Sequence, residues 1–523
     1  MNKLSALVVA LAFGCGSSDE PAPSAEAVEP APLRPAPGLD LSGPIPLPQQ
    51  QAAPKQPAVP IDLDADRAIV KVEVPVPPRG GSVGFTFADD RVGWTAHIPD
   101  SMQLPSVAYA NDRVFVSGGF ESVSFYALNA TTGRIDWATT NLEDNGPTAA
   151  VVEEDDVLFN TESCTLFSLN AKTGKRNWYK YLGDPTLAQI AVTDGLVYAS
   201  HPSDDGGGQY LSAFKVKTGA TVWQRYIGSE LLATPVIAGD SVYISTIGGQ
   251  TFRIDHRSGK VKWQKPLHAT TAPWIAGDEL FVTRRAGAKE QQIVVETETG
   301  KVIREHRMST GTYAHDVPAS LADWKTVWAF EGSRPVVDRG IHYVAMGNEI
   351  VASNAKTGEA IWHRRYAAGA DKRTLGSIAL AGSTIVISSR DGKIYGLDVD
   401  TGYTLWSYDI GHRVVAEPII AEGWIYATTT DGHVIALNVA DKSLDGWHMF
   451  GGNAQKNGFV MPKSPTRPAE LGAQTSSDVT VAPPAAAPPA AAPVSVPRPA
   501  PKHRGAFVIS EVCMTNPLHK DCM

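Results

Sequence analysis

The chain has 523 residues, of which 43% are hydrophobic and 19% charged, and its formal net charge is −9. This length suffices for one large domain plus extensions, and the hydrophobic content is ample for a buried core. The acidic balance argues against a nucleic-acid-binding protein, because such proteins concentrate Lys and Arg on the surface that meets the phosphates.

The first element in chain order is a short export signal, residues 1–15. A positive residue and a brief apolar run precede Cys15, and the run is too short to span a bilayer. Residues 12–15 resemble a bacterial lipobox, which implies that Cys15 is lipidated, and the following Gly16 favours the outer membrane. The alternative is an ordinary secretory signal with an incidental cysteine.

Residues 16–80 are rich in Pro and Ala and poor in aromatic residues, so we expect an extended, disordered linker without a core. Its acidic residues copy the spacing of a calcium loop, which makes a candidate metal site of Asp62, Asp64, Asp66 and Glu73. Arg67, however, stands where that loop needs Gly for its sharp turn. A solvated acidic patch is the alternative interpretation.

The next part of the chain is organised like residues 377–408, in which four short strands follow one another without a helix. Asp391-Gly392 suits a tight hairpin turn, and a second turn lies at residues 400–402. One such sheet cannot bury itself, so copies of it are expected. The pattern predicts a four-stranded antiparallel meander as the repeating unit.

The hairpin between the third and fourth strands recurs at intervals of about forty residues, which with four strands per unit is typical of a β-propeller blade. The repeated turn glycines are Gly133, Gly174, Gly219, Gly259, Gly358 and Gly402, and the tryptophans four residues later are Trp137, Trp178, Trp223, Trp263, Trp362 and Trp406. Eight opening strands can be counted in the sequence. We therefore expect an all-β fold, an eight-bladed β-propeller of four-stranded antiparallel blades, over residues 81–461.

Each repeated residue has a physical role in this interpretation. Gly adopts a positive φ at the turn without steric cost, and Trp offers the neighbouring blade a flat apolar face and an N–H donor. Gly93-Trp94 precedes the first unit and is interpreted as an orphan outer strand that pairs into the last blade and closes the ring. Trp447 either duplicates that role or begins a tail.

The spacing of Ala, Gly and Trp in these repeats resembles the tryptophan-docking motif of PQQ-like propeller repeats, over about residues 90–447. The resemblance implies the fold and leaves the function open. Quinone-dependent dehydrogenases of this kind use two adjacent cysteines, a calcium site and a catalytic Asp in the propeller mouth, with the quinone in the central funnel. BamB-type lipoproteins of the outer-membrane assembly machinery are non-catalytic propellers. Residues 446–459 also resemble a flanking signature found beside these propellers.

One repeat departs from the pattern, since Arg304 stands where Trp is expected and a longer interval follows over residues 305–333. This insertion contains a candidate partner-binding set of aromatic residues, Tyr313, Trp324, Trp328 and Phe330. Aromatic side chains on a long loop over a rigid scaffold suit a protein partner. The alternative is that these rings pack over the gap left by the missing Trp.

Residues 462–504 are again rich in Pro and Ala, and we expect a second disordered linker. The tail, residues 505–523, is more apolar and contains Cys513 and Cys522, a candidate disulfide in an exported protein. The fourth cysteine, Cys164, is interpreted as a buried free thiol on a strand.

No two of the four cysteines are adjacent, and the sequence has no HExxH, GxSxG, CxxC or phosphate-binding glycine loop. The sequence therefore predicts a non-catalytic, BamB-like scaffold without cofactor that docks protein partners in the cell envelope. We expect a monomeric propeller, anchored through Cys15 to the outer membrane and facing the periplasm. The alternatives are a PQQ-dependent dehydrogenase-type oxidoreductase and a propeller that binds polysaccharide or an envelope complex.

Overall fold

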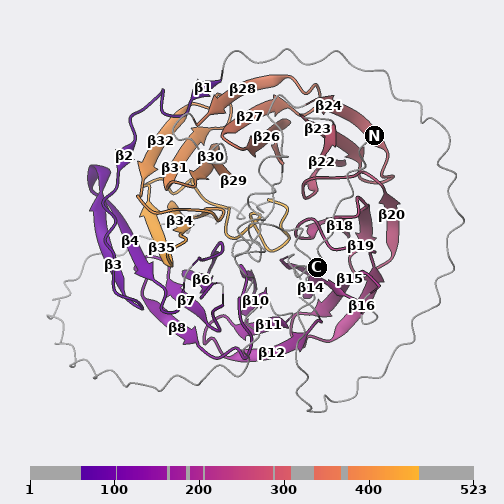
Figure 1. Ribbon diagram of the computed structural model, residues 1–523, viewed down its shortest axis with the longest axis horizontal. Coiled ribbons are helices and arrows are strands. Elements are labelled where there is room, and N and C mark those ends of the chain that lie inside the picture. The colour runs from indigo at the N-terminus through magenta and orange to yellow at the C-terminus, as the bar shows by residue number, and fades with distance from the viewer. Residues whose placement is uncertain are drawn as a thin grey trace, which may run out of the picture. The chain divides into compact units, whose positions relative to one another are not determined.

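The computed structural model describes residues 60–458, except residues 102, 120, 162–164, 184–188, 204–206, 287–288, 308–334 and 367–374. These residues form eight sheets, arranged as the blades of a ring (Figure 1). The prediction of an eight-bladed β-propeller is confirmed. Helix is limited in this part of the chain to a 3-10 turn, η1 (Ala88–Asp90), and no described helix is long and apolar enough to cross a bilayer.

Blades 1–5 each have four antiparallel strands, which follow the chain from the centre of the ring outward. Blade 1 contains β5 (Ala108–Ala110), β6 (Arg113–Ser117), β7 (Phe125–Asn129) and β8 (Ile135–Thr139). Blade 2 contains β9 (Val151–Glu153), β10 (Asp156–Asn160), β11 (Thr165–Asn170) and β12 (Arg176–Tyr181). Blade 3 contains β13 (Ala191–Thr193), β14 (Leu196–Pro202), β15 (Gln209–Lys215) and β16 (Thr221–Tyr226). Blade 4 contains β17 (Val236–Ala238), β18 (Ser241–Ser245), β19 (Thr251–Asp255) and β20 (Val261–Lys265), and blade 5 contains β21 (Trp274–Ala276), β22 (Glu279–Ala286), β23 (Lys289–Glu296) and β24 (Val302–Arg307).

Blades 6–8 each have a fifth strand at the outer edge, supplied by the N-terminal part of the chain. Blade 6 contains β25 (Val336–Asp338), β26 (Ile341–Met346), β27 (Glu349–Asn354), β28 (Ala360–Arg365) and β1 (Ile61–Asp62). Blade 7 contains β29 (Leu375–Ala381), β30 (Thr384–Ser389), β31 (Lys393–Asp398), β32 (Thr404–Asp409) and β2 (Val70–Lys71). Blade 8 contains β33 (Ile419–Ala421), β34 (Trp424–Thr428), β35 (His433–Asn438), β4 (Arg91–His97) and β3 (Ser82–Phe87).

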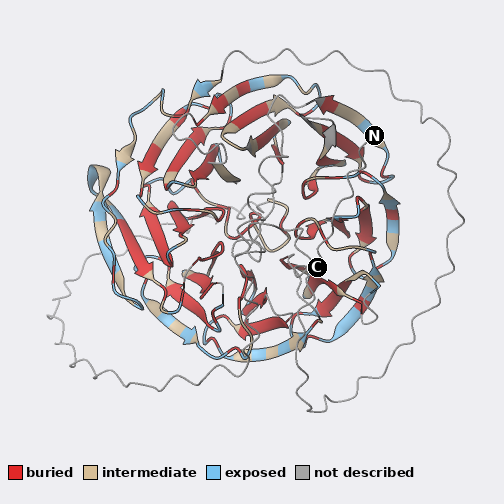
Figure 2. Cartoon of the chain, viewed as in Figure 1, coloured by how far each residue is buried: buried red, intermediate tan, exposed pale blue. Residues whose placement is uncertain are grey.

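Burial decreases from the middle strands of each blade to its outer strand (Figure 2). All residues of β30, with the sequence TIVISS, are buried, whereas the outer strand β12 alternates between half-buried and exposed residues. A continuous apolar run suits a strand covered on both faces by neighbouring blades, and alternation suits a rim that faces water on one side. The hydrophobic core is therefore distributed between the blades.

Neighbouring blades are joined by a tryptophan on the outer strand of one blade, which lies against the glycine turn of the next. The Trp137 indole N–H on β8 donates to the carbonyl oxygen of Ala171 at 3.0 Å. Gly174 has φ +70°, and a Cβ there would lie 2.5 Å from Trp137 Cε3, so the turn needs glycine for both its backbone and its space. The same bond recurs at 2.7–2.9 Å, from Trp178 to Val216, Trp223 to His256, Trp263 to Thr297 and Trp362 to Val399.

Small residues leave room for these indoles within their own sheets. The residues paired with the tryptophans on the third strand include Ala127 opposite Trp137, Ser168 opposite Trp178, Ala213 opposite Trp223 and Ala352 opposite Trp362. The register shifts immediately after each of these pairs, and such a β-bulge bends the outer strand. Both features allow the indole to lean toward the next blade.

Trp94 closes the ring. Its strand, β4, pairs antiparallel with β35 as the fourth strand of blade 8, as expected for the orphan strand at Gly93-Trp94. The Trp94 indole N–H donates to the carbonyl oxygen of Ala130 in blade 1 at 2.9 Å, and its ring lies against Gly133. The first and last blades are thus joined by the same contact as five other blade pairs, which leaves no open edge between them.

Blade 5 replaces the tryptophan contact with a histidine. Arg304 pairs with Glu279 of the same blade at 2.6 Å. The side chain that lies against the glycine turn of blade 6 is His306, since a Cβ on Gly358 would be 2.6 Å from His306 Cγ. Burial lowers the pKa of His306, which favours the neutral ring at this contact. The place of the missing Trp is therefore occupied by a residue two positions further along β24.

Trp406 on β32 also departs from the expected docking arrangement. Blade 8, whose strands are all described, has no third-to-fourth-strand hairpin, because its fourth strand comes from the N-terminal part of the chain. The Trp406 indole lies against Gly396 of its own blade and stacks on Tyr408, with ring centroids 5.4 Å apart.

Residues 60–80, here named the N-terminal belt, are packed along the outside of the propeller, which corrects the expectation of a linker over this stretch. β1 and β2 add parallel strands to the edges of blades 6 and 7 (Figure 1). Leu63 is fully buried and Val72 is 3% exposed. Composition did not indicate this, because the stability of the belt comes from strand edges and apolar surface supplied by distant residues.

We predict that Gly174→Ala destabilises the propeller more than Gly195→Ala does. Both glycines have positive φ, +70° and +73°, so each substitution costs about 1–2 kcal/mol in backbone energy. Only Gly174 lies against an indole, since nothing lies within 4 Å of a Cβ at Gly195. Overpacking should add about 1–3 kcal/mol at Gly174. Thermal unfolding of both variants checks this, and equal losses would contradict docking as the cause.

We also predict that Asp66→Asn loosens the N-terminal belt. Asp66 Oδ2 lies 2.9 Å from Arg364 Nη1 and accepts the Thr404 N–H at 2.9 Å, and the Arg364 side chain is only 6% exposed. Leaving this guanidinium without its carboxylate should lower the free energy of unfolding by about 1–3 kcal/mol. The control is Glu73→Gln, which removes the exposed pair with Lys71 and should leave unfolding unchanged. Identical stabilities for the two variants would show that Asp66 does not hold the N-terminal belt on the propeller.

Candidate functional site

The acidic residues expected as a calcium site, Asp62, Asp64, Asp66 and Glu73, have separate partners. Asp62 accepts the Asp64 N–H at 2.9 Å, and Asp64 accepts the Tyr395 hydroxyl at 2.9 Å. Glu73 pairs with Lys71 at 3.0 Å on the surface. With Asp66 paired to Arg364, these carboxylates fasten the N-terminal belt to the propeller rather than surround a cation.

The remaining expected sites lie outside the described residues. They are the lipidation site Cys15, the candidate disulfide Cys513 and Cys522, the thiol Cys164 and the aromatic set Tyr313, Trp324, Trp328 and Phe330. The chain leaves the propeller for the aromatic insertion after β24 and returns to it at β25.

The strand order decides on which face of the ring this insertion leaves and returns. The turns of an antiparallel meander alternate between two faces, so the glycine turns share one face with the turns between first and second strands. The connections between blades share the opposite face, here named the connection face, with the hairpins between second and third strands. Because β24 and β25 belong to successive blades, the insertion starts and ends on the connection face.

The centre of the ring is occupied by the chain itself, through residues 446–458, here named the central segment (Figure 1). The inner strand of a blade has an unpaired edge that faces the channel. The central segment forms backbone hydrogen bonds with the middle residue of four inner strands. These bonds are Tyr109 N–H to His448 O at 2.6 Å, Val192 N–H to Ala454 O at 2.8 Å, Ile237 N–H to Gln455 O at 3.0 Å, and a reciprocal pair between Ile420 and Trp447 at 2.7 and 3.1 Å.

Trp447 anchors the central segment, so it neither closes the ring nor begins a free tail. Its side chain is fully buried and stacks on Trp274 of blade 5, with ring centroids 6.4 Å apart. Its indole N–H donates to the carboxylate of Glu417, which also accepts the Gly451 N–H at 3.0 Å. The central segment is therefore packed against inner strands of five blades in the middle of the ring.

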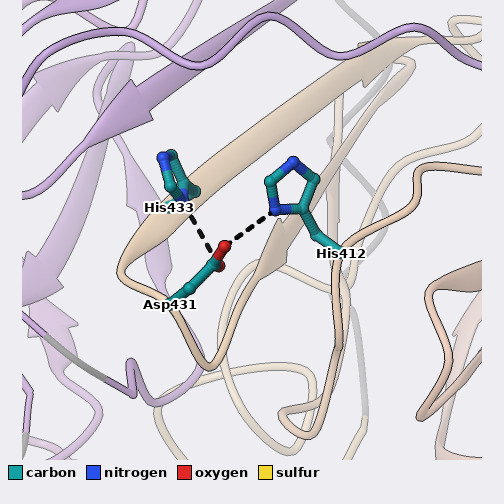
Figure 3. Close-up of side chains that lie close together, drawn as sticks. All are labelled: His412, Asp431 and His433. Carbon is teal, nitrogen blue, oxygen red and sulfur yellow. Dashed lines mark hydrogen bonds and ion pairs between the residues drawn. The ribbon is translucent and has the colours of Figure 1, made fainter.

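A cluster of two histidines and an aspartate lies on the connection face, at His412, Asp431 and His433 (Figure 3). His412 belongs to the connection between β32 and β33, and the other two flank the turn between β34 and β35. Asp431 Oδ2 is 3.0 Å from His412 Nδ1, and Asp431 Oδ1 is 3.2 Å from His433 Nδ1. These two imidazoles hold the pKa of Asp431 well below its usual range, so the carboxylate is ionised.

The ring of His433 packs on His97, the last residue of β4, with centroids 4.2 Å apart. Burial, and next the nearby His433, lower the pKa of His97, so this ring is neutral at pH 7. Sequence reasoning missed the cluster because His412 and Asp431 come from separate loops, and His97, which packs on His433, comes from a separate N-terminal strand. The available signal was Asp431-Gly432-His433, a hairpin turn with two metal-ligand residue types.

The propeller has relatives among known proteins. The sequence matches the family described as "Outer membrane protein assembly factor BamB" over residues 79–306 and 368–480. A relative of that name from Yersinia pestis is 25% identical over 382 residues, which are 69% of this chain and 77% of the relative.

Two solved structures share the fold. BamB from Moraxella catarrhalis has a TM-score of 0.50 at 18% identity, over 68% of this chain and 98% of that one. Quinohemoprotein alcohol dehydrogenase from Comamonas testosteroni has a TM-score of 0.51 at 13% identity, over 66% and 76% of the two chains. At these identities the similarity shows the propeller alone and does not separate a scaffold from an enzyme. The family match spans more than half of the chain, so this protein belongs to the family of outer membrane protein assembly factor BamB.

Proposed function

We propose that this protein is a non-catalytic scaffold on the periplasmic side of the outer membrane, where it docks protein partners during outer-membrane protein assembly. The observation that supports the proposal most directly is the segment packed in the centre of the ring. The central segment bonds to inner strands of blades 1, 3, 4 and 8 and stacks on blade 5. A quinone in the central funnel, which the dehydrogenase alternative requires, would have to displace this packed segment.

The surfaces that are left for function are the two faces and the rim. The N-terminal belt and β3 cover the outer edges of blades 6–8, so strand addition by a partner is blocked there. The connection face includes both ends of the aromatic insertion, and aromatic residues are the side chains most often responsible for binding energy at protein interfaces. We therefore assign partner docking to the connection face, through Tyr313, Trp324, Trp328 and Phe330.

The mode of attachment follows from the N-terminal sequence. A lipid on Cys15, with the Pro-rich residues that follow it as a tether, would hold the propeller at the outer membrane while leaving both faces accessible. The protein would then act as a monomer that meets its partners near the membrane surface.

The docking surface is tested by replacing residues 308–334 with a Gly/Ser linker. The propeller should remain folded, because the gap at the missing Trp is filled by His306, whereas partner recovery from cross-linked cell envelopes should fall about tenfold or more. The matched control is Tyr181→Ser, which removes an exposed aromatic residue from the outer strand of blade 2. Unchanged recovery with the linker variant would exclude the insertion, and recovery of glycans instead of proteins would favour the polysaccharide-binding alternative.

The anchor is tested by Cys15→Ala. This variant should move from the membrane fraction to the soluble periplasmic fraction and lose incorporation of labelled fatty acid, because several acyl chains together provide stable attachment. Cys164→Ala is the control and should stay with the membrane. Membrane retention of Cys15→Ala would show that attachment depends on partners rather than on lipid.

A further inference from the structure

We propose that His412, Asp431 and His433 bind a divalent transition-metal ion of the zinc class. The three potential ligand atoms, one from each residue, lie within 4.8 Å of one another. The inference is independent of the proposed docking function, since it rests on a different part of the connection face and needs no partner. It concerns the connection between blades 7 and 8, close to the strand that closes the ring.

The distances between the side-chain atoms of these three residues are close to those between the ligand atoms of a zinc site. In a tetrahedral zinc site with bonds of about 2.0–2.1 Å, ligand atoms lie about 3.3 Å apart. Asp431 already has its two oxygens 3.0 and 3.2 Å from the Nδ1 atoms of His412 and His433 (Figure 3). Small side-chain rotations would therefore place two nitrogens and one oxygen around a common point. His412 is the most adaptable of the three, because it lies on a loop.

The turn that presents Asp431 and His433 is held in place by its surroundings. Thr429 Oγ1 donates to Asp431 Oδ1 at 2.5 Å and accepts the His433 N–H at 2.9 Å. The Gly432 carbonyl accepts the Ile98 N–H at 3.0 Å. The Thr430 N–H donates to the carbonyl oxygen of Arg413 at 3.0 Å. Because Arg413 follows His412 directly, this bond holds the turn beside the loop that carries His412. Ligands fixed in this way need little ordering on binding, which favours affinity.

A hydrogen-bonded triad without metal is the competing explanation, and His433 argues against it. This residue is 4% exposed, yet in the part of the chain that the structure describes its Nε2 has no hydrogen-bond partner and its Nδ1 meets Asp431 only as an ion pair at 3.2 Å. Its Nδ1 is close to Asp431 but poorly aligned for an N–H···O bond. A buried imidazole without hydrogen bonds is costly, and coordination of Nδ1 to a metal would satisfy it.

The donor set indicates the kind of metal. Two imidazole nitrogens and one carboxylate suit Zn²⁺ and, in other geometries, Ni²⁺ or Cu²⁺, whereas Mg²⁺ and Ca²⁺ prefer oxygen ligands only. Three protein ligands leave a fourth position for water. A metal here would join the blade 7 to blade 8 connection to the hairpin of blade 8, so binding would stabilise the folded chain.

The test is equilibrium dialysis and titration calorimetry of the full chain, purified without a polyhistidine tag and treated with a chelator, against ZnCl₂ at neutral pH. We expect one zinc per chain with a Kd of about 1 μM or tighter and a rise in Tm at saturation. His412→Ala and Asp431→Asn should weaken binding about 100-fold, because each removes one ligand. His412 is on a loop and Asp431 is half exposed, so both variants should fold, which their unfolding without metal checks.

The matched control is His448→Gln, which removes a histidine that also contacts a carboxylate, Asp445 at 2.7 Å, but belongs to no three-residue cluster among the described residues. This variant should bind zinc like the wild type. Co²⁺ should give the visible absorption of a four-coordinate site in the wild type and in His448→Gln, and not in Asp431→Asn. Absence of zinc binding at about 100 μM, equal affinity of the ligand variants, or displacement of zinc by Ca²⁺ would each overturn the proposal.

Discussion

Six of the eight pairs of neighbouring blades are joined by a contact between a tryptophan of one blade and the glycine turn of the next. A single four-stranded blade cannot bury both of its faces, so each blade needs a neighbour on either side. The indole supplies flat apolar area and an N–H, and the turn supplies a carbonyl oxygen and the space of a missing Cβ. In blade 5, His306 takes the place of the tryptophan against Gly358, so the contact tolerates another planar ring where the glycine is kept.

The two ends of the described chain protect the edges that this contact leaves free. The N-terminal belt and β3 cover outer edges of blades 6–8, and the central segment bonds to inner edges of blades 1, 3, 4 and 8. Both arrangements satisfy backbone groups that would otherwise face water or another molecule. The central segment also places packed polypeptide in the middle of the ring, between its two faces.

The candidate sites were harder to predict from the sequence than the fold. The spacing of Asp62, Asp64 and Asp66 resembled a calcium loop, but Tyr395 and Arg364, more than 290 residues away in the chain by their numbers, bind two of these carboxylates. Conversely, the Asp431-Gly432-His433 turn did not indicate that His412 also meets Asp431. Local spacing is informative where ligands come from one loop, whereas His412 and Asp431 come from two separate loops.

The sequence by itself determined the repeating unit, the number of blades and the role of Trp94 in closing the ring, because turns, strand periods and docking residues are local and repeated. Only the tertiary structure decided the places of Trp447, of the N-terminal belt and of the histidine cluster. The places of Trp447 and of the N-terminal belt depend on contacts with residues that lie far away along the chain, and the histidine cluster depends on how two separate loops fold together. The physical reason is that turns and strand periods are set by residues close together in the chain, so a repeated pattern indicates the local structure. A single long-range contact forms only after the blades have assembled.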